Sequence, residues 1–260
     1  MTADTPPLLE LKDITRRFGA IEALRGVSFA VRRGEVVALL GDNGAGKSTL
    51  VKIIAGGLEA TSGSMTFEGV ARTFASPAAA KAAGIETVYQ DLSLCTNVDV
   101  VANFFMGREI VKRVFGVPVL DEAAMEETCA KAIAAAGTKI PSLRINVEHL
   151  SGGQRQAIEL NRFVHWGGKL VLLDEPFAAL GVEQTRRGLD MIKRVAAQGI
   201  GVIIITHVMA QAFQVADRIV VIRQGVVAGD VANARTSPEE VIRLITGDAQ
   251  LGRQASAQGH

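Results

Sequence analysis

The stretch GDNGAGKST, residues 41–49, follows the pattern G-x-x-x-x-G-K-[ST] and predicts a loop that binds phosphate groups. Its glycines let the backbone turn N–H groups inward around the phosphates. We expect Lys47 to carry its charge to the β- and γ-phosphates and Ser48 to offer its hydroxyl to Mg²⁺. Every residue of the loop is a candidate nucleotide contact: Gly41, Asp42, Asn43, Gly44, Ala45, Gly46, Lys47, Ser48 and Thr49.

The segments on both sides place this loop between a strand and a helix. Residues 36–40 (VVALL) are continuously apolar, as in a parallel strand buried on both faces. The stretch KSTLVKIIAG, which starts at Lys47, is typical of a helix. The loop pattern alone also fits an ordinary strand–turn–helix connection, and this context favours the phosphate-binding interpretation.

The remaining pattern predicts an α/β fold in which a P-loop nucleotide-binding core carries two additions. Alternating apolar residues between positions 9 and 31 predict an antiparallel β subdomain, and residues 91–165 are mainly helical, with helices at 98–106 and 121–136. Buried strands at 170–173 and 202–205, with a helix at 182–197 between them, belong to a mixed, largely parallel sheet.

We therefore expect a single domain with an insertion. The core with its β subdomain comprises residues 1–90 and 166–246, the inserted helical subdomain residues 91–165, and a polar tail residues 247–260. Smaller expected elements are a helix capped by Ser76 and ending at Gly84, a strand at 85–89, a hairpin at 218–223 and 226–231, and a helix from Ser237 to about position 245.

The stretch KLVLLDEP, residues 169–176, combines an apolar strand with two adjacent carboxylates. A buried strand that ends in Asp174 would place this carboxylate beside the phosphate loop, where it can hold Mg²⁺. Glu175 is then suited to orient the attacking water or accept its proton. Taken alone, the pair also fits a strand whose acidic end meets solvent.

The stretch LSGGQRQ, residues 150–156, offers a hydroxyl and glycine N–H groups at the start of a helix, because QAIELNRFV follows in helical pattern. Such a site suits phosphate, although Ser-Gly-Gly also fits a flexible turn. Its position just upstream of the apolar strand and the Asp–Glu pair makes the string specific.

Composition limits the classes of partner. The chain has 28 basic and 27 acidic residues, a net charge of +1, so we expect no nucleic-acid binding. No apolar run approaches the roughly 18–20 residues of a membrane helix, so any work at a membrane would require docking onto something else. The two cysteines lack the spacing of a metal site.

The three motifs in this order resemble those of the ATP-binding subunits of ATP-binding cassette (ABC) transporters. The resemblance covers nearly the whole chain and implies an ATPase with ATP and Mg²⁺ as ligands. It assigns Gln90 to contact Mg²⁺ or water and to link to the transmembrane partner, His207 to lie beside the γ-phosphate, and Phe18 to stack on adenine. Outside this frame, these residues fit a loop amide, an ordinary strand-end histidine and a core aromatic.

The resemblance also implies partners. Two copies would dimerise head to tail, so that Ser151 and Gly153 of one copy close over ATP held by the other. Transmembrane permease subunits would bind near Gln90 and the following helix, at the cytoplasmic face of the inner membrane. Candidates for that docking are six apolar residues, although for most of them the core side of an amphipathic helix is the favoured interpretation: Val98, Val100, Val101, Phe104, Phe105 and Met106.

Within the family, FAALGV at residues 177–182 is similar to the ribose, xylose and fructose class of sugar importers, in a single-module form. That class implies an extracytoplasmic sugar-binding protein. Phe177 departs from the family pattern, in which a small Thr or Ser is usual, and Gly181 stands at a common aspartate position. The alternatives are a transporter of amino acids or lipids, a non-transport cassette ATPase, and a regulatory subunit that binds ATP with little turnover.

Overall fold

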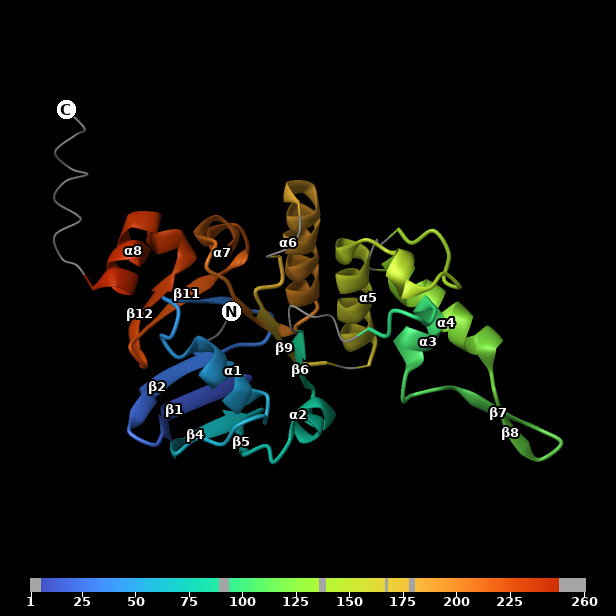
Figure 1. Cartoon of the computed structure of the whole chain (residues 1–260), viewed down its shortest axis with the longest axis horizontal. Helices are drawn as coiled ribbons and strands as arrows, with labels where there is room; N and C mark the ends of the chain where they lie inside the picture. Colours follow the sequence, from blue (N-terminus) through green and yellow to red (C-terminus); the bar gives the residue numbers. More distant parts are fainter. Residues whose placement is uncertain (1–5, 89–93, 136–138, 167, 178–180, 248–260) are drawn as a thin grey trace.

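The computed structural model describes residues 6–88, 94–135, 139–166, 168–177 and 181–247. Figure 1 shows an antiparallel sheet and a mixed sheet at one end of the molecule and a helical part at the other. The expected fold class is therefore confirmed, and the candidate site lies at the carboxyl ends of the strands of the mixed sheet.

The central sheet has six strands in the order β12-β11-β3-β10-β9-β6, and only β12 runs antiparallel to its neighbour. The predicted buried strands and the predicted hairpin are all present. The strands are β3 (Val36–Leu40), β6 (Ile85–Val88), β9 (Leu170–Asp174), β10 (Gly201–Ile205), β11 (Arg218–Arg223) and β12 (Val226–Ala232).

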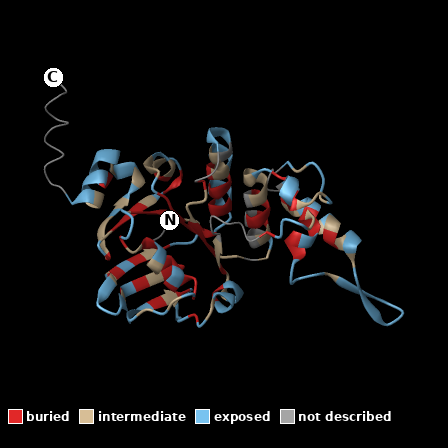
Figure 2. Ribbon diagram, viewed as in Figure 1, coloured by how far each residue is buried: buried red, intermediate tan, exposed pale blue. Residues whose placement is uncertain are grey.

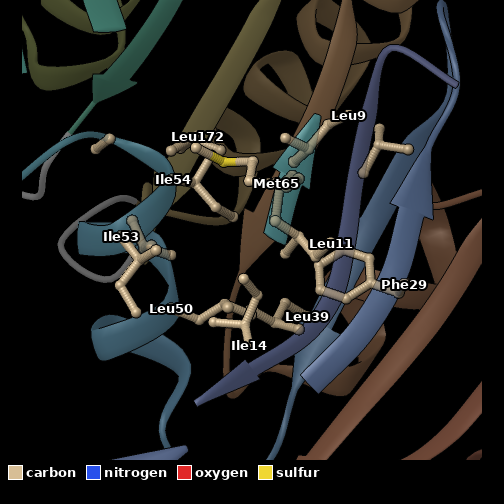
Figure 3. Packing of buried hydrophobic residues seen from close by; sticks show 14 of the residues in the cluster. Leu9, Leu11, Ile14, Phe29, Leu39, Leu50, Ile53, Ile54, Met65 and Leu172 are labelled. Carbon is tan, nitrogen blue, oxygen red and sulfur yellow. The ribbon is translucent and has the colours of Figure 1, made fainter. Parts of the chain in front are cut away.

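Both faces of this sheet are covered, which explains why its strands are continuously apolar. On one face, Leu39 and Leu172 belong to a hydrophobic cluster that includes α1 and the antiparallel sheet, called the first cluster. On the other face, Ala38 and Leu173 belong to a second cluster that includes three later helices. Figure 3 shows α1 packed against the strands of the first cluster. The helices are α1 (Lys47–Ile54), α6 (Val182–Ala197), α7 (Met209–Val215) and α8 (Pro238–Thr246).

The antiparallel sheet has the order β2-β1-β4-β5. Its first two strands confirm the expected β subdomain, but β4 and β5 were not predicted, because the segment SGSMTF supplies only Met65 and Phe67 to the core. The helix capped by Ser76 is present as expected. These elements are β1 (Leu9–Phe18), β2 (Ile21–Val31), β4 (Ser62–Phe67), β5 (Val70–Ala71) and α2 (Pro77–Ala83).

The helical part has its own hydrophobic cluster, built by three helices and the 3-10 turn Val147–His149. A β-hairpin inside this region was not predicted and projects from the helices. The elements are α3 (Val100–Phe105), α4 (Glu122–Ala135), α5 (Gly152–His165), β7 (Val111–Val114) and β8 (Val117–Leu120).

For most of the apolar residues around α3, the favoured interpretation as core is confirmed, and their alternative docking role is wrong. The helix is shorter than predicted, and its cluster against α4 and α5 buries Val100, Val101, Phe104 and Phe105, so these side chains form core. Met106, just beyond the helix, is 40% exposed. In the parts of the chain that are described, the helices are all too short or too polar to cross a membrane.

Candidate nucleotide-binding site

The parallel register collects the candidate residues at one edge of the central sheet. Asp174 at the end of β9 is paired with Ile205 at the end of β10, and Ile205 is paired with Leu39 in β3. The carboxyl ends of parallel strands form the usual ligand-binding edge of an α/β sheet. The residues that follow these strands, Gly41, Glu175 and His207, therefore emerge together.

The phosphate loop contacts β2 on one side and the turn between β11 and β12 on another. Gly225 N donates a hydrogen bond to Ala45 O at 2.9 Å. Gly46 precedes α1 with φ 112°, and a Cβ there would lie 2.7 Å from Ala23 O in β2. Only glycine allows this backbone conformation and this close approach together.

Lys47 lies inside the loop that precedes it. Its Nζ donates hydrogen bonds to Gly41 O at 2.6 Å and Asp42 O at 2.9 Å. Burial lowers the pKa of Lys47, and the charges of Glu175, Asp42 and Asp174 oppose this effect. The loop thus concentrates a partly desolvated positive charge beside the carboxylates at the ends of the strands.

Asp174 is a half-buried carboxylate on the same edge. Burial raises the pKa of Asp174, the charge of Glu175 raises it further, and Lys47 and Lys52 oppose the increase. A cation bound beside this group would stabilise its ionised form. Within the described parts of the chain, no three His, Cys, Asp or Glu side chains form a metal-sized cluster.

Glu175 and His207 contact each other directly. His207 Nδ1 lies 2.8 Å from Glu175 Oε1, although 32 positions separate them in the chain. Glu175 has φ 48°, an uncommon conformation for a residue other than glycine, and its N–H donates to Ile205 O at 2.9 Å. Thr206 is fully buried between Ile205 and His207, and its hydroxyl accepts from Val208 N.

A cleft of about 300 Å³ opens beside the loop, between β3 and the segment that follows β10. Two of its residues, Met209 and Ile245, were not singled out from the sequence, because they carry only an apolar signal and come from α7 and α8. The lining residues are Leu40, Gly41, Asp42, Asn43, Thr206, His207, Met209 and Ile245.

The other predicted site residues lie on separate elements. Phe18 is 45% exposed at the end of β1, where the guanidinium of Arg16 lies 4.7 Å from the ring centroid. Ser151 and Gly153 lie at the start of α5, in the helical part. Ser151 Oγ accepts from Gln154 N at 3.3 Å, and Ser151 N donates to Gln154 Oε1 at 3.0 Å, a reciprocal helix cap. Gln90 lies outside the described residues.

Comparisons with known proteins identify the family of the chain. The model of the family described as ABC transporter matches residues 24–178. The chain is 43% identical over 246 residues to the xylose/arabinose import ATP-binding protein XylG of Sulfolobus acidocaldarius, covering 95% of this chain and 96% of that protein. It is 38% identical over 255 residues to the fructose import ATP-binding protein FrcA of Rhizobium meliloti, covering 96% and 98%.

Solved structures show the same fold. A nucleotide-free ATP-binding cassette from an ABC transporter is 25% identical and superposes with a TM-score of 0.77, covering 95% of this chain and 98% of that one. Another ATP-binding cassette, in its ADP conformation, has the same TM-score at 24% identity and covers 98% and 100%. The phosphate loop, the carboxylate pair at the end of β9 and these matches lead to one conclusion: the chain belongs to the ABC transporter family as an ATP-binding subunit.

Proposed function

We propose that this chain is the ATP-hydrolysing subunit of an ABC importer for a monosaccharide of the xylose, ribose or fructose type. The proposal that the chain hydrolyses ATP rests on the 2.8 Å contact between Glu175 and His207 beside the phosphate loop. The sugar class rests on relatives named as xylose/arabinose and fructose import proteins, each matched over nearly its whole length.

In this proposal, the loop binds the triphosphate of ATP through its backbone N–H groups, and Lys47 adds a positive charge. Ser48 and Asp174 would hold Mg²⁺, together with Gln90, because hydroxyl and carboxylate oxygens suit this ion and Asp174 is a partly desolvated carboxylate. When bound, Mg²⁺ neutralises charge on the β- and γ-phosphates. Phe18 offers an exposed ring for the adenine base.

Glu175 would orient the attacking water and accept its proton. The Glu175 side chain is 25% exposed, so it can reach water. The contact with His207 fixes the orientation of its carboxylate. His207 is more exposed, at 68%, and could turn toward the γ-phosphate. Catalysis would then consist mainly of positioning and charge stabilisation.

The site would be completed by a second copy of the chain. Ser151 and Gly153 begin α5, so their backbone N–H groups lie at a positive helix end suited to phosphate. A related cassette has been solved as a dimer with ADP and phosphate. Two copies would serve permease subunits at the cytoplasmic face of the membrane and, for import, an extracytoplasmic sugar-binding protein.

The decisive variant is Glu175→Gln, which keeps the shape of the side chain and removes the base. We expect ATP binding to persist while hydrolysis falls by at least about 100-fold, the usual contribution of a general base. Binding of a fluorescent ATP analogue and phosphate release would be measured on the same samples. Glu127→Gln, on the exposed side of α4, is the matched control and should hydrolyse ATP normally.

If Glu175→Gln hydrolysed ATP at the wild-type rate, Glu175 would not be the general base. If the wild-type chain showed no ATPase activity in the presence of its permease, the proposal that it is an ATPase would be wrong. The sugar class needs a separate readout. In a strain that lacks this chain, wild-type protein should restore uptake of xylose, ribose or fructose, and Glu175→Gln should not. Restored uptake of an amino acid instead would overturn the sugar assignment.

A further inference from the structure

The hairpin β7–β8 projects from the helical part and pairs only with itself, as a two-stranded sheet. All residues of both strands are exposed (Figure 2). This exposure is unusual because the segment is rich in large apolar residues, and isolated hairpins have little stability of their own. The exposed apolar side chains are Val111, Val114, Phe115, Val117, Val119 and Leu120.

The tip of the hairpin is its most apolar part. Phe115 and Gly116 form the two-residue turn with φ 51° and 83°, and the Phe115 side chain is fully exposed. Turns with two positive φ angles favour Asn-Gly or Asp-Gly, so a phenylalanine at the first position is not explained by the turn. Val114 and Val117 flank it, also exposed, so that the tip presents three large apolar side chains to solvent.

Two cationic residues of β7 lie immediately behind this tip. Arg113 is paired with Pro118 and Lys112 with Val119, one and two positions back from the Val114–Val117 pair. Residues 110–120 contain no Asp or Glu. Lys112 forms an ion pair of 3.1 Å with Asp121 at the base of the hairpin, whereas Arg113, one position nearer the tip, is exposed. The order along the hairpin is therefore apolar tip, then cations, then the folded helical part.

We propose that residues 113–118 insert into the surface of a lipid bilayer that contains anionic lipids. The layering of the hairpin matches that of the bilayer: Phe115 and its neighbours would reach the boundary of the acyl chains, while Arg113 and Lys112 would lie at the phosphate groups. Phenylalanine is among the side chains that proteins bury at this boundary, and a shallow insertion leaves the unpaired edges of the hairpin in contact with water.

Two protein partners fit the same surface less well. A second copy of the hairpin would bring Arg113 and Lys112 against like charges, which is unfavourable. Addition of β8 to the edge of a partner's sheet would be interrupted by Pro118, which has no backbone N–H to donate. The lipid surface uses the apolar tip and the cations together and needs no hydrogen bond from the strands. The inference is independent of the proposed ATPase mechanism, since none of these residues lies at the nucleotide site.

The test uses the purified full chain and vesicles of phosphatidylcholine, with or without about a quarter of phosphatidylglycerol. We expect flotation with the anionic vesicles and little with the neutral ones. Phe115→Asn suits the turn, so it should fold normally, yet partition about tenfold more weakly, as expected when an aromatic side chain no longer leaves water. Arg113→Gln should reduce the preference for anionic lipid. Val70→Thr, at an exposed apolar position of β5, is the matched control and should bind as wild type.

The depth of insertion can be read independently. The chain has one tryptophan, Trp166, which packs against Phe105 in the helical core. Phe115→Trp adds a second one at the tip, and lipids brominated in the acyl chains should quench its fluorescence while leaving that of wild type unchanged. The proposal is overturned if wild type floats no better than Phe115→Asn, or if the added tryptophan is not quenched. Equal flotation combined with loss of permease binding in Phe115→Asn would also overturn it, and would indicate a protein partner.

Discussion

At the scale of single residues, the site contains two charged side chains whose burial disfavours their charged forms. Burial lowers the pKa of Lys47 and raises that of Asp174, so the folded chain bears a cost for keeping both groups charged. Glu175 adds an uncommon backbone conformation at the same edge of the sheet. Such costs are typical of sites that are prepared for a ligand rather than for maximal stability.

Asp174→Asn should therefore separate stability from activity. Because the pKa of Asp174 is raised in the folded chain, the folded state holds the proton of this carboxyl more tightly than the unfolded state does. The cost of ionisation is fully present above the raised pKa and disappears as the pH falls below the ordinary value of 3.8. At neutral pH the variant should unfold at a higher temperature than wild type and lose Mg²⁺-dependent ATPase activity.

Thermal unfolding of both proteins in the absence of nucleotide, measured from neutral pH downward, checks this expectation. The difference in unfolding temperature should shrink as the pH is lowered, since wild-type Asp174 is then protonated in both states. A variant that is less stable than wild type at neutral pH would show that the ionised carboxylate contributes favourable contacts that outweigh its desolvation.

At the scale of elements, the segment after β9 is anchored to α6 by an aromatic ring. Phe177 is 3% exposed and lies two positions after Glu175. Gly188 lies inside α6, and a Cβ there would be 2.3 Å from Phe177 Cε1. The glycine thus makes room for the ring, and the ring restricts the segment that carries the candidate base.

Gly188→Ala should lower the free energy of unfolding by about 1–3 kcal/mol, because the added methyl group overpacks the contact with Phe177. Helix propensity alone predicts the opposite, a gain of about 1 kcal/mol. Urea unfolding measures the difference. In the background of Phe177→Val, the same substitution should be neutral or stabilising, and a destabilisation of equal size in both backgrounds would exclude this contact as the cause.

At the scale of the whole molecule, Arg218 at the start of β11 joins the two large sheets. Its Nε lies 2.7 Å from Glu35 Oε1, its Nη1 lies 2.6 Å from Asp230 Oδ2, and its Nη2 donates to Ala30 O in β2. The side chain is 17% exposed, so its partners would lose their charge compensation in a partly desolvated site if it were removed.

Arg218→Ala is therefore expected to lower the free energy of unfolding by about 3 kcal/mol. Arg187→Ala is the matched control, because Arg187 forms an exposed ion pair with Glu183 on α6 and its loss should change stability by less than about 0.5 kcal/mol. Denaturant unfolding of both variants gives the comparison. Equal effects would mean that the junction between the sheets is held by its hydrophobic cluster alone.

Assembly also belongs to this scale. If Ser151 of one copy completes the nucleotide site of another, specific ATPase activity should rise with protein concentration until dimers predominate. Ser151→Arg should abolish this rise while leaving ATP binding by the monomer intact, because α5 lies apart from the phosphate loop within one chain (Figure 1). Activity strictly proportional to the concentration of a dilute monomer would contradict the shared site.

The sequence by itself determined the elements whose signals are local. Residues 36–40 are apolar throughout because both faces of β3 are buried, and Ser76 and Ser237 cap their helices through contacts three residues away. The loop around Lys47 was likewise predictable, because its glycines and lysine are adjacent in the chain. The candidate site residues on this loop and at the end of β9 follow from such signals.

Only the tertiary structure decided which distant residues meet. The contact of Glu175 with His207 depends on the parallel register of β9 and β10, and the place of Phe177 depends on a glycine in α6. The hairpin at residues 111–120 also escaped prediction, because its exposed apolar strands lack the alternation that burial on one face imposes. The first two interactions join segments that are far apart in the chain, and within the described parts of the chain the hairpin has no layer of side chains covering it. A local sequence pattern contains no information about either.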